Sequence, residues 1–145
     1  MACTDSTNRH HRPSPFNHVI MGIDMGFDMI PRIPPTDDAA MSKWALFISD
    51  VEEEYEDDPN FTYKNSCFVF TVAEHPKISI RGDRFLRCSS KISGRQGSEA
   101  EHYIRALYKM AKVHFGSRVK MWHDCVEESL EGIYSWTEVH DAEKE

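Results

Sequence analysis

The fold is decided by two adjoining stretches, ISIRGDRFLRCSSKIS (residues 78–93) and SEAEHYIRALYKMAKVHF (residues 98–115). In the first stretch apolar and polar residues alternate on either side of Gly82-Asp83, a pair that favours a tight turn, so we expect a β-hairpin. In the second stretch apolar residues recur at helical spacing, and a capping-box pattern begins at Ser98. The change of period predicts one sheet with a helix packed across it.

Two further elements are expected before this stretch. Apolar residues alternate with Asp24 and Asp28 in a predicted strand, which places the two carboxylates on the face opposite to the apolar side chains. A helix should begin after a cap at Thr36 or Asp37 and end before the next proline. Its apolar stripe, spaced by three and four residues, is formed by Met41, Trp44, Ile48, Val51 and Tyr55.

Strands are also predicted on both sides of the deciding stretch. FTYKNSCFVFTVA (residues 61–73) is typical of a hairpin with its turn in the middle. Residues 119–124 alternate as a further strand, and residues 133–134 add a short strand before a helical turn capped by Ser135. Together these elements predict an α+β fold in which an antiparallel sheet of about five strands is covered by two helices.

The chain is expected to form one compact domain. Its length of 145 residues and its hydrophobic content of 40% are typical of a single globular core. We place the α+β domain at residues 22–140, after a flexible N-terminal tail (residues 1–21) and before an acidic C-terminal tail (residues 141–145). Four scattered cysteines without a CxxC pair do not indicate a disulfide scaffold. No apolar run approaches the roughly 20 residues that span a bilayer, so we expect a cytoplasmic protein without a membrane partner.

Charge is distributed unevenly along the chain, whose net charge is −7. Residues 36–58 carry nine Asp or Glu and one Lys, and residues 124–145 carry eight Asp or Glu and one Lys. Residues 74–123, which lie between them, carry eleven Lys or Arg and four Asp or Glu. The net charge argues against nucleic acid as a partner. The basic segment is either neutralised by the acidic ones within the fold or forms a site for an anion.

Several phrases of the sequence resemble a family of fungal proteins. They are GFDMIPRI, EHPKISIRGDRFLRCSSKISG and HFGSRVKMW, and the resemblance extends over residues 22–123. No activity is assigned to that family, so the resemblance implies no functional residue in this chain.

The first candidate function is binding of a small polar or anionic molecule. Four basic residues run along one arm of the hairpin into a Ser- and Gly-rich loop that precedes a helix; they are Arg84, Arg87, Lys91 and Arg95. Unpaired N–H groups at a helix N-terminus attract phosphate or carboxylate, and arginine adds bidentate hydrogen bonds. These four residues are therefore the predicted anion-binding set. The alternative is that Arg81 and Arg87 lie on the sheet surface and face the acidic helix.

Acid–base catalysis without a cofactor or a metal is an extension of this hypothesis. His75, His102 and Tyr103 supply groups that exchange protons or donate a hydrogen bond to a developing oxyanion. Asp24 or Asp28 could reach the same end of the sheet. Such a set suits a lyase, an isomerase or a cyclase that acts on a small polar molecule.

The alternative function is a non-enzymatic protein-interaction module of the inhibitor or immunity type. Its two acidic segments would steer a basic partner toward the protein. A closed pocket that contains His75 and at least two of the arginines would favour the ligand hypothesis, whereas a flat acidic face would favour the partner hypothesis.

Overall fold

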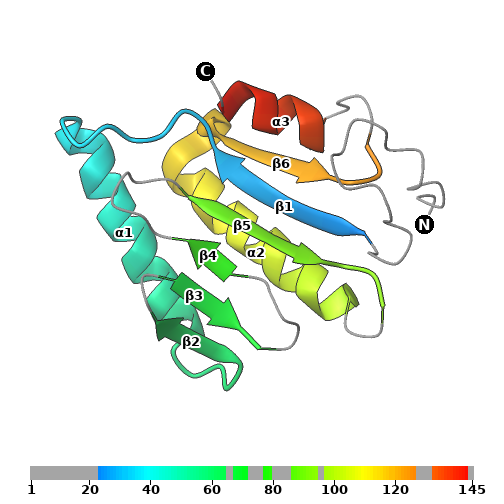
Figure 1. Ribbon diagram of the computed structural model, residues 1–145. Helices are drawn as coiled ribbons and strands as arrows, with labels where there is room; N and C mark the ends of the chain where they lie inside the picture. The colour runs from blue at the N-terminus through cyan, green and yellow to red at the C-terminus, as the bar shows by residue number, and fades with distance from the viewer. Residues whose placement is uncertain are drawn as a thin grey trace.

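In a computed structural model, the protein consists of a mixed β-sheet with helices on both of its faces (Figure 1). The structure describes residues 23–64, 67–71, 77–79, 86–94, 97–126 and 132–143. Within these residues the sheet has seven strands in the order β2-β3-β4-β5-β1-β6-β7. The strands are β1 (Asp24–Met29), β2 (Phe61–Lys64), β3 (Cys67–Phe70), β4 (Lys77–Ser79), β5 (Arg87–Lys91), β6 (Val119–His123) and β7 (Ile133–Ser135). The helices are α1 (Asp38–Tyr55), α2 (Gly97–Phe115) and α3 (Trp136–Glu143), with a 3-10 turn η2 at Gly116–Arg118.

The α+β class is confirmed, but the sheet is larger than predicted and is not purely antiparallel. We predicted an antiparallel sheet of about five strands covered by two helices, and the described residues form seven strands and three α-helices. Strands β6 and β7 run parallel, with Met121 opposite Ile133, while the other neighbouring strands are antiparallel. Local alternation indicates a strand but not the direction of its partner, and strands of three residues carry little periodic signal.

Strand β1 is an interior strand of the sheet, between β5 and β6 (Figure 1). The predicted alternation of apolar and polar side chains along β1 is confirmed. Met25, Phe27 and Met29 are fully buried in the main hydrophobic core. Because successive side chains of a strand point to opposite faces, Asp24 and Asp28 lie on the other side of the sheet.

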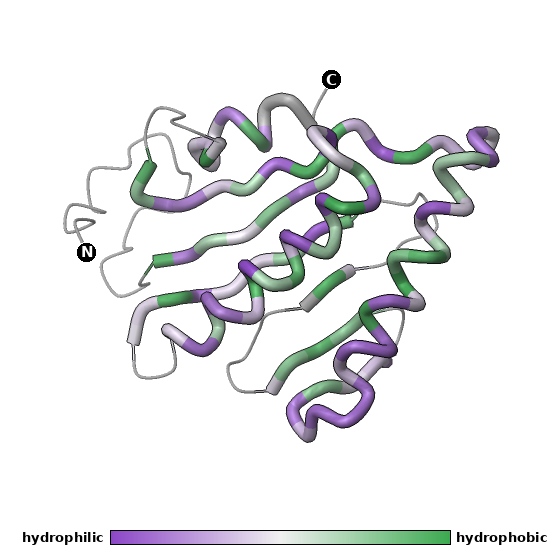
Figure 2. Tube along the Cα trace, turned by 180° about the vertical axis from the view of Figure 1, so that it is seen from behind, coloured by the Kyte–Doolittle hydropathy of each residue, from purple (hydrophilic) through white to green (hydrophobic). Residues whose placement is uncertain are grey.

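Helices α1 and α2 cover the same face of the sheet and pack against each other, as the view from behind shows (Figure 2). The carboxylate of Asp37 caps α1 as predicted, because its Oδ1 accepts a hydrogen bond from the N–H of Ala40 at 3.0 Å. The buried residues of α1 are Ala40, Trp44, Phe47, Val51 and Tyr55. The predicted stripe was therefore right at three positions, and Met41 and Ile48 are only partly buried. Helix α2 begins at Gly97, so the predicted capping box that starts at Ser98 is wrong.

An aromatic cluster fills the space between α1, α2, β2 and β3. The ring of Phe70 is fully buried, and its centroid lies 4.9 Å from that of Tyr55 and 4.5 Å from that of Tyr103. Phe61 lies 5.3 Å from Phe70 and stacks on Phe68 at 5.5 Å. Each such pair contributes about 0.5–1.5 kcal/mol beyond the burial of its area. The cluster therefore ties the β2-β3 hairpin to both long helices.

Candidate functional site

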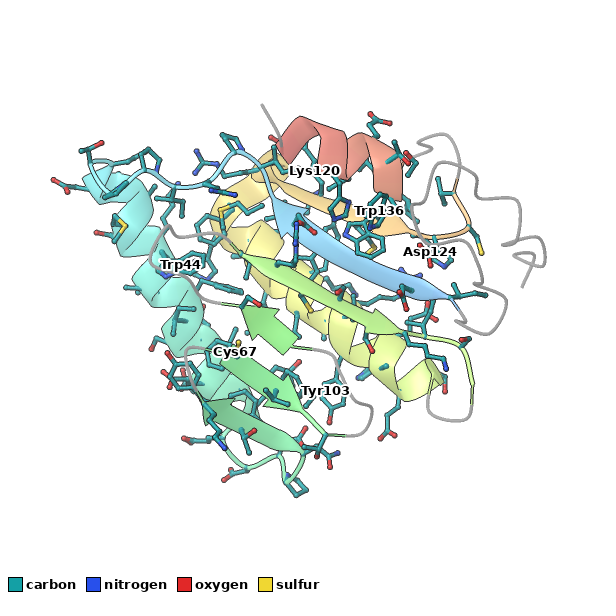
Figure 3. The ribbon with its side chains drawn as sticks, in the orientation of Figure 1. Trp44, Cys67, Tyr103, Lys120, Asp124 and Trp136 are labelled. Carbon is teal, nitrogen blue, oxygen red and sulfur yellow. The ribbon has the colours of Figure 1, made fainter. Side chains whose placement is uncertain are left out.

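The side of the sheet opposite to α1 and α2 carries mostly polar side chains, and we refer to it as the polar face. On the neighbouring strands β5, β1 and β6 its residues are Asp24, Gly26 and Asp28 of β1, Arg87, Ser89 and Lys91 of β5, and Lys120 and Trp122 of β6. Gly26 allows β5 to approach, because a Cβ atom there would lie only 2.6 Å from the Cβ atom of Ser89. Helix α3 contacts the β6 side of the sheet, where Lys120 and Trp136 are seen in Figure 3.

A fully buried carboxylate lies on the polar face. Asp28 is 0% exposed, and its Oδ2 accepts a hydrogen bond from Nε of Arg87 at 2.9 Å. Its Oδ1 accepts a second hydrogen bond, from Nε1 of Trp122 at 3.0 Å. A buried charge is costly unless it is paired and hydrogen-bonded, and each Asp28 oxygen has a directional donor. Asp28 and Arg87 can form this ion pair because the strand register places them opposite one another in β1 and β5.

Helix α3 brings a histidine to the same carboxylate. The ring of His140 stacks on Trp136 with centroids 4.2 Å apart and meets Trp122 edge-on at 5.5 Å. Its Nδ1 lies 2.7 Å from the carbonyl oxygen of Trp136, and its Nε2 lies 4.0 Å from Oδ2 of Asp28. The start of α3 is capped by Ser135, as predicted, because the N–H of Glu138 donates to its hydroxyl at 3.0 Å. The Asp28 cluster is thus Asp28, Arg87, Trp122 and His140.

Sequence reasoning missed two members of the Asp28 cluster, Trp122 and His140. The alternation over residues 119–124 puts Trp122 on the same face as Lys120, but it does not say which residue a side chain reaches across the sheet. The pair Trp136 and His140 has the i, i+4 spacing of neighbours on one helix face, which was an available signal. It was overlooked because only one helical turn was expected there, whereas α3 extends to Glu143.

Part of the predicted anion-binding set lies together on the polar face. Arg87 is paired with Asp28, and its side chain remains 34% exposed. Lys91 is exposed at the other end of the same strand, on the same face. Arg84 and Arg95 lie outside the described residues. The structure therefore brings two of the four predicted residues to one face, with a carboxylate of the same chain beside one of them.

The predicted catalytic residues His102 and Tyr103 lie on α2, across the sheet from Arg87. Tyr103 is 8% exposed, and its hydroxyl donates a hydrogen bond to Oδ2 of Asp58 at 2.7 Å. Burial, together with this hydrogen bond, raises the pKa of Tyr103 above its usual value. His102 is exposed on the helix, and the third predicted residue, His75, lies outside the described residues. The sheet thus separates His102 and Tyr103 from the arginine with which they were expected to act.

Buried tyrosines predict a loss of stability in alkaline solution. Burial, reinforced by the carboxylate of Glu54, raises the pKa of Tyr55 to about 12 from its ordinary value of 10.0. The unfolded chain ionises first, so the free energy of unfolding should be constant below pH 10 and should fall by up to about 3 kcal/mol as the pH approaches 12. Urea denaturation at several alkaline pH values measures the effect. The variant Tyr55→Phe should show a shallower decline than the parent, and the exposed-site control Tyr63→Phe should not. An identical decline of the free energy of unfolding in the parent and in Tyr55→Phe would contradict the assignment of this effect to Tyr55.

Comparison of the chain with protein-family models, with curated proteins and with solved structures finds no match. The resemblance to fungal sequences therefore stays a prediction. In the part of the chain that the structure describes, no three His, Cys, Asp or Glu side chains gather as a metal site. No helix of that part is long and apolar enough to cross a membrane.

Proposed function

We propose that the protein binds a small anionic molecule on the polar face, with Arg87 as the principal contact. One observation carries this proposal: the Nε of Arg87 donates a hydrogen bond to the buried Asp28, and 34% of the Arg87 side chain is exposed. A guanidinium group has five N–H donors in a fixed plane, and a hydrogen bond through Nε sets the orientation of that plane. An arginine that is already oriented loses less conformational freedom when it binds a carboxylate or phosphate.

Lys91 is the second contact in this proposal. It lies four residues from Arg87 on the same face of β5, which corresponds to about 13 Å along a strand. Ser89, half-buried between them, offers a hydroxyl on the same line. This spacing favours an elongated ligand with an anionic group at one end and a second negative or polar group at the other. Arg84 and Arg95 remain predicted contributors from the segments that flank β5.

The proposal is restricted to binding. His102 and Tyr103 are on the helix side of the sheet, so a ligand held by Arg87 would not contact them. Tyr103 also has its hydroxyl engaged by Asp58, which favours a structural role. The acid–base hypothesis therefore receives no support from these two residues, whereas the ligand hypothesis is supported by Arg87 and Lys91.

The binding proposal predicts a specific pattern among variants. Phosphate, succinate, citrate and nucleoside monophosphates can be titrated against the protein while tryptophan fluorescence is followed, because Trp122 contacts the same carboxylate as Arg87. At least one anion should bind, and Lys91→Ala should weaken its binding by about tenfold, as expected for loss of one charged contact. Arg87→Lys should weaken it similarly, because lysine keeps the charge but not the planar fork.

Two matched variants serve as controls for this titration. Lys109→Ala removes an exposed lysine from α2, and His102→Ala removes the predicted catalytic histidine from the same helix. Both should bind the anion as the parent does. Affinities of Lys91→Ala and Arg87→Lys equal to that of the parent for every anion would refute the proposed site.

A further inference from the structure

Strand β2 forms the outer edge of the sheet among the described strands (Figure 1). In an antiparallel pair, successive residues turn their N–H and C=O groups alternately toward the partner strand and away from it. The carbonyl of Asn60 accepts from the N–H of Thr71 across the β2-β3 pair at 2.8 Å, so Thr62 also turns toward β3. Tyr63 therefore directs its backbone N–H and C=O outward from the sheet.

The edge also presents an aromatic ring. Tyr63 is 47% exposed, and its ring centroid lies 4.7 Å from that of Phe68, at the border of the aromatic cluster. A strand added beside β2 would bring one of its side chains next to this ring, as cross-strand neighbours do. An apolar side chain at that position would extend the cluster by one strand.

The end of α1 that packs over β2 is rich in carboxylates. The C-terminal end of α1 lies over β2, where the ring of Tyr55 is 5.9 Å from that of Phe61. The last turn of α1 has no basic residue. The exposed acidic residues at this end of the helix are Glu52, Glu53, Glu54, Glu56 and Asp57. A positively charged segment at the β2 edge would therefore lie in a favourable field.

The charge pattern disfavours a second copy of this chain at the edge. Pairing of two β2 strands would bring two acidic α1 ends together, and like charges at an interface cost energy. Lys64 is exposed at the end of β2, and lysine on an edge strand is a common feature that opposes self-pairing. The charge pattern thus favours a different molecule that is basic.

We propose that β2 accepts an extended segment of another protein, in which Lys or Arg alternates with apolar residues, as an eighth strand of the sheet. The backbone of Tyr63 supplies hydrogen bonds, its ring supplies an apolar contact, and the end of α1 supplies the complementary charge. This interaction uses the β2 edge and the helix side of the sheet, and it does not depend on anion binding at Arg87.

The test uses three synthetic peptides of equal length: alternating Lys-Val, alternating Lys-Pro and alternating Glu-Val. Lys-Pro keeps the charge of Lys-Val but loses every second backbone N–H, since proline has none, and its fixed φ favours polyproline II over a strand. Calorimetric titration at low salt should show binding of Lys-Val only, with an affinity that falls as salt is raised. Equal binding of Lys-Pro and Lys-Val would overturn the proposal, because it would show attraction by charge alone.

Two variants at Tyr63 distinguish the contribution of its backbone to binding from that of its side chain. Tyr63→Pro removes the outward N–H and the ring, whereas Tyr63→Ala removes only the ring; proline is tolerated on an edge strand where its N–H would face solvent. Tyr63→Pro should weaken Lys-Val binding by at least about tenfold, and by more than Tyr63→Ala does. Circular dichroism and thermal unfolding check that both variants are folded. Equal affinity of Tyr63→Pro and the parent, or a parent dimer that Tyr63→Pro dissociates in sedimentation, would overturn the proposal.

Discussion

Replacement of Arg87 by methionine should lower the free energy of unfolding by about 3–5 kcal/mol, which is the cost typical of removing one partner from a buried ion pair. The cost is high because Asp28 is 0% exposed and would lose the guanidinium Nε that now lies 2.9 Å from its Oδ2. The hydrogen bond from Trp122 would remain on one carboxylate oxygen, and the ring of His140 would remain 4.0 Å from the other. Urea denaturation at neutral pH measures the loss.

A matched variant and a double variant make this result specific. Lys91→Met changes an exposed residue on the same strand and the same face, so it should alter stability by less than about 0.5 kcal/mol. Asp28→Asn combined with Arg87→Met removes both charges and leaves an amide oxygen for Trp122. This double variant should be more stable than Arg87→Met alone, since it contains no uncompensated carboxylate. A loss for Arg87→Met no larger than that for Lys91→Met would disprove the structural role of the pair.

The second large effect is expected in the aromatic cluster. Phe70→Ala should destabilise the protein by about 3–5 kcal/mol, because it removes a fully buried ring and leaves a cavity between Tyr55 and Tyr103. Thermal unfolding followed by circular dichroism reports the change. Val113→Ala, at a side chain that is 82% exposed, should stay within about 0.5 kcal/mol of the parent. If Phe70→Ala lost less than about 1 kcal/mol, the cluster would not be closely packed.

The sequence could predict which face of each strand or helix is buried, because that face follows from the spacing of apolar residues along the chain. Alternation placed Asp28 opposite to the buried Met25 and Phe27, and it placed Trp122 beside Lys120 on one face of β6. The spacing of the apolar residues also predicted both long helices. Each of these predictions depends on residues that are close together in the chain, which is the information that a single sequence carries most directly.

Contacts between distant segments could not be predicted in the same way. The Asp28 cluster joins residues 28, 87, 122 and 140, which come from four elements, and their meeting depends on the strand order and on the third helix. The sequence predicts Arg87 as an anion-binding residue, and the alternative is a position on the sheet surface facing the acidic helix. The structure places it beside Asp28, a residue that had been considered only as an aid to catalysis.

The position of β1 has a consequence for how the protein folds during its synthesis. This strand leaves the ribosome before the others, yet its two neighbours in the sheet are residues 87–91 and 119–123. Almost a hundred further residues must be translated before both edges of β1 have strands with which to form hydrogen bonds. The β2-β3 hairpin and α1 are close in sequence and can associate early, whereas β1 stays without its neighbouring strands until they have been made.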